Sequence, residues 1–183
     1  EKKDIPQPRL EAEILLAHVL GAERIDLYMK YDQPVAEAER AAYRDLVRRR
    51  AEREPTRYLV GGCEFMSLAM KVTPDCLIPR PETEMLVEEV LARSGAPRAA
   101  TVKSRVPPNE AAARPDAPAA PVTAIDLCTG CGCVAVSLAV NLPRAQITAT
   151  DISPAAIEVA RANAEGHGVA DRIALLEGDL YAP

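Results

Sequence analysis

One short stretch, residues 124–132 (Ala-Ile-Asp-Leu-Cys-Thr-Gly-Cys-Gly), has the residue types best suited to hold a small ligand. The apolar run that leads into it predicts a buried strand, and the small apolar residues 134–140 after it predict a helix. A strand, a glycine turn and a helix form the opening of a nucleotide-binding α/β unit. Glycine lets a ligand approach the backbone closely, and the amides at a helix start attract negative charge.

Two carboxylates follow the next two predicted strands. Asp151 ends the strand predicted over residues 146–151 and lies 21 residues after Gly130 (151 − 130), a separation that suits an acid bonded to a ribose diol. Asp179 comes just after the strand predicted over residues 172–177. Together the two acids favour a ligand with a ribose and an adenine amino group to fix, whereas a simple turn acid is the alternative for Asp179.

A nicotinamide dinucleotide is a second candidate ligand at this loop. Gly130, Gly132 and Ala135 also fit the looser form of the dinucleotide fingerprint. The glycine spacing therefore predicts a nucleotide-type ligand without deciding between the two.

Overall composition is that of a soluble globular protein. The 183 residues carry 22 Lys and Arg against 27 Asp and Glu, a net charge of −5, which argues against a surface that coats nucleic acid. One Phe, five Tyr and no Trp leave few rings for base stacking. The sequence shows neither an apolar run of membrane-spanning length nor the layout of a signal peptide, so we expect a cytoplasmic location.

The five cysteines raise the question of a metal site. Cys128, Cys131 and Cys133 lie in the glycine loop, but Cys63 and Cys76 are remote in sequence and neither histidine is nearby. Structural zinc usually takes four nitrogen or sulfur ligands. We therefore predict no metal, and in the cytosol no disulfide, with the thiols acting as small space-filling side chains.

The N-terminal third predicts a helical bundle. Apolar spacing favours helices over residues 9–20, 25–31 and 36–53, and His18 is expected to pack inside the bundle. The third helix must stop by Glu54, because Pro55 disfavours a helical neighbour. Its inward face is expected to hold Ala42, Tyr43, Leu46 and Val47.

A basic face on this third helix has two interpretations. Its arginines are Arg40, Arg44, Arg48, Arg49, Arg50 and Arg53, with Arg57 just beyond. Acidic residues are interspersed, which favours a solvated face with local ion pairs. The alternative is a docking surface for an acidic protein or for RNA.

The middle of the chain predicts a hairpin and a stiff turn. Alternation over residues 68–73 indicates a half-buried strand that residues 63–66 can join as a hairpin. The sequence Leu-Ile-Pro-Arg-Pro-Glu-Thr-Glu at 77–84 follows, in which Pro81 can open a helix. This loop either caps that helix or forms one wall of a ligand pocket. Residues 95–121 are rich in Ala and Pro and predict a disordered insertion.

These motifs together resemble the HemK/PrmC family, the peptide-chain-release-factor glutamine methyltransferases. The resemblance is carried by Tyr-Leu-Val-Gly at 58–61, the proline-rich motif at 77–84, and Asp126-x-x-Thr129-Gly130-x-Gly132. Residues 11–21 and the three arginines 48–50 are similar to the helical domain of that family. The resemblance covers nearly the whole chain outside the Ala/Pro insertion.

The resemblance implies an α/β architecture in three parts. These are a helical substrate-recognition domain over 1–57, a β-hairpin connector over 58–80, and over 81–183 the first half of a Rossmann-like class I methyltransferase sheet. The family transfers a methyl group from S-adenosylmethionine to the side-chain amide nitrogen of the glutamine in a Gly-Gly-Gln motif, which leaves S-adenosylhomocysteine. Release factors are the implied partners, without direct nucleic-acid binding.

The same resemblance implies which residues hold the cofactor. The loop residues Cys128, Thr129, Gly130, Cys131 and Gly132 would line its methionine and ribose part. Asp151 would hold the ribose hydroxyls, and Asp179 with Leu180 would lie at the adenine. The pocket wall would be Pro79, Arg80 and Pro81.

The sequence also departs from the family pattern. No Asn-Pro-Pro-Tyr motif, which in the family positions the reacting amide, occurs in the 183 residues, so no catalytic residue is assigned. Cys128 and Ser67 stand where the family has glycine, and a cysteine at a positive φ would be strained. With only three strands, the first would be an unpaired apolar edge, so we expect a fragment that is inactive in isolation.

Two further functions stay open at this point. One is a methyltransferase for another protein substrate, such as a ribosomal protein. The other is a non-catalytic module whose helical domain binds a partner while the sheet does no chemistry.

Overall fold

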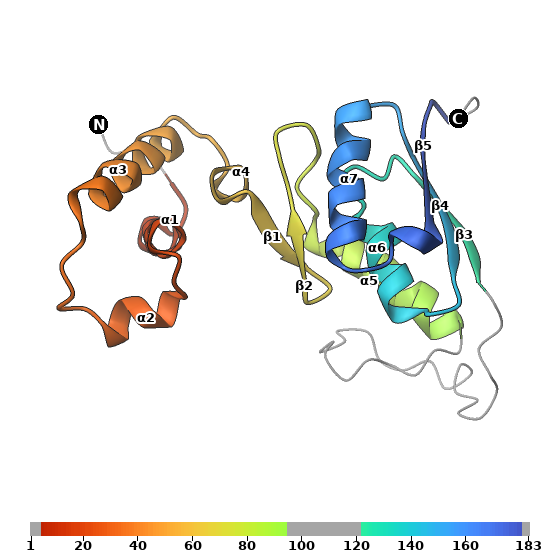
Figure 1. The fold of residues 1–183 in the computed structure, drawn as a ribbon, viewed down its shortest axis with the longest axis horizontal. Coiled ribbons are helices and arrows are strands. Elements are labelled where there is room, and N and C mark those ends of the chain that lie inside the picture. Colours follow the sequence, from red (N-terminus) through yellow and green to blue (C-terminus); the bar gives the residue numbers. More distant parts are fainter. Residues whose placement is uncertain (1–4, 95–121, 181–183) are drawn as a thin grey trace. The chain divides into compact units, whose positions relative to one another are not determined.

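The computed structural model describes residues 5–94 and 122–180, which fall into two compact units, Glu1–Gly61 and Gly62–Pro183 (Figure 1). The first unit is helical, and the second contains a hairpin, three further helices, one 3₁₀ turn and a parallel sheet. The predicted α/β class is confirmed. The insertion predicted over 95–121 lies outside the described residues.

Four helices make up the first unit: α1 (Pro8–Leu20), α2 (Arg24–Met29), α3 (Glu37–Ala51) and α4 (Thr56–Val60). Proline occupies the first position of α1, where its missing N–H costs nothing, and Gly21 closes the helix at φ +58°. The three predicted helices are thus confirmed. Helix α4 was not predicted, since five residues are too few to show a helical period.

The core of this unit is small, and two predictions about it are wrong. Leu15, Ala17 and Leu59 are buried, whereas His18 is exposed and does not pack inside the bundle. On α3 only a narrow stripe with Tyr43 and Leu46 is half-buried. Ala42 and Val47, which were predicted to face inward, flank that stripe and are exposed. One neighbouring helix covers only a narrow stripe of a surface helix.

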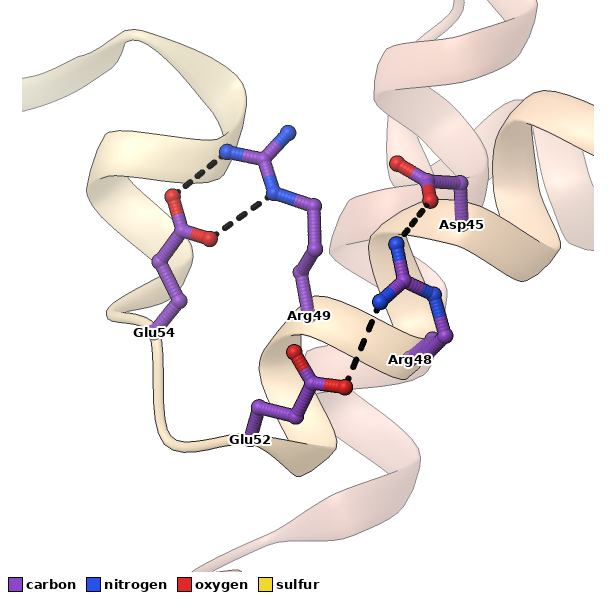
Figure 2. A network of polar contacts seen from close by, with 5 residues as sticks. All are labelled: Asp45, Arg48, Arg49, Glu52 and Glu54. Atoms are coloured by element: carbon purple, nitrogen blue, oxygen red, sulfur yellow. Dashed lines mark hydrogen bonds and ion pairs between the residues drawn. The ribbon is translucent and has the colours of Figure 1, made fainter.

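Four arginines of α3 are paired with nearby carboxylates, two of them drawn in Figure 2. Arg48 contacts Asp45 at 2.6 Å and Glu52 at 3.3 Å. Arg49 binds Glu54 through two parallel bonds of 2.8 and 2.5 Å, which hold the pKa of the Glu54 carboxyl below its usual value. Arg40 and Arg50 pair with Glu37 and Glu11. These contacts favour the interpretation of a solvated face with local ion pairs.

The sheet of the second unit is parallel throughout. Its strands β3 (Thr123–Leu127), β4 (Gln146–Asp151) and β5 (Ile173–Glu177) lie in the order β3-β4-β5. Helix α6 (Cys133–Asn141) connects the first two strands, and α7 (Pro154–Gly166) with the 3₁₀ turn η1 (Ala170–Arg172) connects the last two. This is the repeated strand–helix–strand order of half a Rossmann-like sheet, as predicted.

Register brings the carboxyl ends of the strands together. Leu127 of β3 lies beside Thr150 of β4, and Asp151 lies beside Glu177 of β5. Strand β3 pairs only with β4 among the described strands, and on one of its faces Ile125 and Leu127 are 68% and 53% exposed. The predicted apolar edge is therefore present in the structure.

The hairpin belongs to the second unit. It consists of β1 (Gly62–Phe65) and β2 (Leu68–Lys71), joined by Met66 and Ser67, which both have positive φ (+51° and +59°). Glu84, on helix α5 (Pro81–Arg93), accepts a hydrogen bond from the Met66 amide at 2.8 Å.

We predicted a division after residue 57, with residues 58–80 as a separate connector. The compact units divide after Gly61 instead, because residues 56–60 form α4 and the hairpin groups with the sheet.

Candidate functional site

The glycine loop runs from the end of β3 to the start of α6 and is tied to the neighbouring strand. The Thr129 amide donates to the Thr150 carbonyl at 2.8 Å, and the Gly132 amide donates to the Thr129 carbonyl at 2.9 Å. Cys128, Gly130 and Gly132 all have positive φ, at +59°, +56° and +78°. The loop therefore stands at the carboxyl edge of the sheet, where open α/β sheets bind their ligands.

The Asp126 carboxylate stabilises the loop through two hydrogen bonds. Its Oδ2 accepts the Thr129 hydroxyl at 2.6 Å and the Ala135 amide, in the first turn of α6, at 3.2 Å. Burial raises the pKa of Asp126, and the nearby charge of Asp151 raises it further, while both hydrogen bonds lower it. In the sequence, Asp126 is named as part of a motif but is assigned no role. The Asp-x-x-Thr spacing was the signal from which its hydrogen bond with Thr129 could have been predicted.

Replacement of Asp126 by asparagine should remove a pH dependence of stability. Because the folded-state pKa is raised, the contribution of this group is fully present below the unfolded value of about 3.9 and is lost as pH rises through the folded pKa. An asparagine oxygen can accept both bonds without a charge. We expect the unfolding free energy of Asp126→Asn, measured with denaturant, to rise progressively above that of the wild type from pH 4 to pH 7.

The exposed Asp171 serves as the control for this comparison. Its change to asparagine should leave the pH profile as in the wild type. A constant difference between Asp126→Asn and wild type across this pH range would contradict the assignment.

Asp151 and Gly130, predicted to form one site, are in direct contact. Asp151 Oδ2 accepts the Gly130 amide at 2.8 Å, and Oδ1 accepts the Ser153 amide at 3.0 Å. Each carboxylate oxygen can accept a further hydrogen bond. The half-buried carboxylate is thus fixed beside the loop with acceptor capacity left for the hydroxyls of a ligand.

The two glycines of the loop differ in their surroundings. A Cβ on Gly130 would meet nothing within 4 Å, so the space beside this residue is open. A Cβ on Gly132 would lie 3.0 Å from the Ala160 Cβ of α7. Gly130 therefore faces the open side of the loop, whereas Gly132 allows the loop to pack on α7. Open space beside Gly130 and a carboxylate at Asp151 fit a cofactor that carries a ribose.

The cysteines of the loop have distinct environments. Cys128 is exposed, whereas Cys131 and Cys133 are buried. The neighbouring Cys133 thiol and burial both raise the pKa of Cys131, which keeps it protonated. The part of the chain that the structure describes holds no cluster of three or more His, Cys, Asp or Glu side chains suited to a metal ion.

Replacement of Cys128 by glycine should stabilise the protein. A non-glycine residue at φ +59° costs about 1 kcal/mol relative to glycine, and part of that gain is offset by the greater freedom of glycine in the unfolded chain. We expect Cys128→Gly to raise the unfolding free energy by up to about 1 kcal/mol, measured by urea denaturation. The matched control is Cys128→Ala, which loses the thiol but keeps the Cβ; an equal gain in both variants would show that φ is not the cause.

The remaining predicted site residues lie in the same unit but are more exposed. The Gly178 amide donates to the Asp151 carbonyl at 3.0 Å, which ties the end of β5 to the end of β4. Asp179 and Leu180 follow directly and are exposed. Pro79 is half-buried, Arg80 precedes α5, and Pro81 is its first residue. Their contacts with a ligand stay predictions.

Two family models match the chain and together span both units. Residues 1–61 match the PrmC N-terminal domain, and residues 116–183 match the methyltransferase small domain. By fold and by the second match, the sheet unit has the architecture of a class I methyltransferase domain. The structure describes no helix with the length and apolar character needed to cross a membrane.

The curated relatives make the relationship more specific. A release factor glutamine methyltransferase of Rhodopirellula baltica is 42% identical over 180 residues, 98% of this chain and 55% of that protein. One from Geobacter sulfurreducens is 43% identical over 182 residues, 100% of this chain and again 55% of the relative. The resemblance to the HemK/PrmC family is therefore confirmed. The chain spans about half the length of these relatives.

Solved methyltransferase structures are similar to shorter parts of the chain. A SAM-dependent methyltransferase from Geobacter sulfurreducens in complex with S-adenosyl-L-homocysteine is 31% identical, with a TM-score of 0.30, over 32% of this chain and 23% of the other.

Proposed function

We propose that this chain is the cofactor-binding and substrate-recognition part of an S-adenosylmethionine-dependent enzyme, a protein-(glutamine-N5) methyltransferase. Its substrate would be the glutamine of the Gly-Gly-Gln motif in peptide chain release factors. The observation that carries this proposal is the identity of 42–43% along nearly the whole chain to proteins named for that activity. The contact between Asp151 and Gly130 supports it independently.

The proposed binding mode uses groups that the fold already fixes. Asp151 accepts hydrogen bonds from the ribose hydroxyls, and the open side of Gly130 admits the ligand to the backbone. Asp179 and Leu180 lie at the adenine, Cys128 to Gly132 line the methionine and ribose part, and Pro79 to Pro81 border the pocket. Because the loop and Asp151 are held by hydrogen bonds, little ordering of these two parts is needed on binding.

S-adenosylmethionine supplies an activated methyl group on its sulfonium, so the main task of the protein is alignment for in-line attack. The residues of this chain bind and orient the cofactor and exclude water from its ribose. None of the described residues is assigned to activate the glutamine amide.

The helical unit is proposed to recognise the release factor, in the cytoplasm and without direct contact to nucleic acid. Pairing of the α3 arginines with neighbouring carboxylates argues against a phosphate backbone as the partner. Phosphate binding relies on cations that displace counterions.

Calorimetric titration of this chain with S-adenosylhomocysteine tests the cofactor assignment, with NAD as the comparator. We expect micromolar binding of S-adenosylhomocysteine and no measurable binding of NAD. Tighter binding of NAD would overturn the proposal. Release-factor binding without any cofactor binding would instead indicate a partner-binding module, and binding of a ribosomal protein in place of a release factor would change the substrate.

A further inference from the structure

One buried side chain joins the glycine loop to the hairpin. Asn163 of α7 is 4% exposed, and its amide makes three hydrogen bonds to backbone groups. Its Oδ1 accepts the Lys71 amide at 2.7 Å, while Nδ2 donates to the Lys71 carbonyl at 3.0 Å and to the Cys131 carbonyl at 2.8 Å. A residue of β2 and a residue of the loop, sixty positions apart in sequence (131 − 71), thus share one amide.

The Asn163 side chain hydrogen-bonds to the Lys71 backbone in the way that a neighbouring strand would. Both backbone groups of Lys71 are paired with the same amide, and the Ala69 carbonyl, two residues earlier in β2, contacts the His167 ring nitrogen at 2.8 Å. Residues two apart in a strand present their backbone groups to the same edge. Asn163 of α7 and His167, which follows directly after that helix, therefore cover the outer edge of β2.

The same face of α7 also holds the loop. Ala160 lies one turn before Asn163 and is the residue on which Gly132 packs. Residues three and four apart on a helix are neighbours on its surface, so Ala160, Asn163 and His167 form one continuous stripe. Along this stripe, Ala160 contacts the loop, Asn163 binds both the loop and the hairpin, and His167 contacts the hairpin.

Loss of the Asn163 amide would leave three backbone groups without their partners, the Cys131 carbonyl in a buried place and the two groups of Lys71 in a partly buried one. Each such group costs about 1–3 kcal/mol unless water or local movement satisfies it. The loop can relax only by movement of the Cys131 peptide, which lies directly between Gly130 and Gly132. His167, by contrast, serves the hairpin alone.

We propose that Asn163 is a positioning residue that couples the cofactor loop to the hairpin, so that cofactor binding orders β2 and an ordered β2 strengthens cofactor binding. The proposal rests on the proposed function in that the loop takes S-adenosylmethionine. Linkage requires the coupling to be equal in both directions.

The test compares Asn163→Ala with His167→Ala, two variants that each loosen the hairpin while only the first releases the loop. Without ligand, hydrogen exchange at the amides of residues 130–133 should accelerate at least tenfold in Asn163→Ala and stay within twofold of wild type in His167→Ala. The dissociation constant for S-adenosylhomocysteine, measured by calorimetry, should rise about tenfold in the first variant, equivalent to about 1.4 kcal/mol, and less than twofold in the second.

A third measurement probes the reverse direction. S-adenosylhomocysteine should slow exchange at the Lys71 amide in wild type and in His167→Ala. Equal effects of the two variants on loop exchange, or an unchanged Lys71 amide in the cofactor complex, would overturn the coupling. If Asn163→Ala does not fold, Asn163→Asp, which keeps the acceptor for Lys71 but loses both donors, takes its place.

Failure of the proposed function gives a different result from failure of this inference. Absence of S-adenosylhomocysteine binding by wild type refutes the cofactor assignment and with it the effect on affinity. The ligand-free exchange of the loop then still decides whether Asn163 positions it.

Discussion

Replacement of Gly132 by alanine should destabilise the protein more than any other glycine substitution in the loop. The new Cβ would stand 3.0 Å from the Ala160 Cβ and 3.2 Å from its Cα, and the residue would keep φ at +78°. The backbone conformation costs about 1–2 kcal/mol, and overpacking against a buried helix adds about 1–3 kcal/mol. We therefore expect a loss of about 2–5 kcal/mol in unfolding free energy, measured by urea denaturation followed by circular dichroism.

Gly130→Ala is the matched control for this change. Its φ is also positive, but its Cβ would meet nothing within 4 Å, so only the backbone cost of about 1–2 kcal/mol applies. This variant should stay folded yet lose affinity for S-adenosylhomocysteine by at least tenfold, because the methyl group occupies the open side of the loop. Equal destabilisation by both substitutions would show that packing on Ala160 is not the cause.

Replacement of Asp151 by alanine should weaken cofactor binding strongly. The carboxylate fixes the Gly130 amide and, under the proposed function, accepts the ribose hydroxyls. Hydrogen bonds to a charged group contribute about 1.5–3 kcal/mol each, so we expect S-adenosylhomocysteine affinity to fall at least a hundredfold. Calorimetry on folded Asp151→Ala gives the dissociation constant directly.

The control for this result is Asp171→Ala. Asp171 is an exposed carboxylate in η1, before β5 begins, and so lies at the opposite end of that strand from Asp179. Its loss should leave affinity within twofold of wild type. An affinity of Asp151→Ala close to that of wild type would remove the physical basis of the proposed site.

Sequence patterns predicted the unit that contains the parallel sheet well because the interactions that shape it are local. Glycines, an acid at the end of the second strand and a proline at a helix start each act within a few residues, so their positions could be inferred from spacing alone. Gly130 and Asp151 were assigned to one site, and the structure brings them into contact because parallel strands end at one edge of the sheet. The positive φ of Cys128 agrees with the resemblance, which places this cysteine where the family has glycine.

Several of the interactions that sequence patterns missed join segments remote in the chain. Asn163 is polar, so nothing in the sequence pattern indicated that it is buried. Its burial depends on two backbone segments, and neither is visible from the helix sequence. The prediction for His18 was wrong in the opposite direction, since a residue expected to be buried is exposed. Apolar neighbours in the sequence do not ensure that another helix covers the side chain.

The hairpin turn carries a consequence for how its strands are aligned. Met66 and Ser67 both adopt left-handed conformations without the glycine that usually favours them, so the turn residues by themselves select this alignment weakly. A slip by one position would exchange the buried Phe65 and Met70 with their solvent-facing neighbours. Glu84 from one helix and Asn163 from another bind this hairpin at opposite ends and oppose such a slip. The alignment of the two hairpin strands is therefore fixed by their contacts with the two helices.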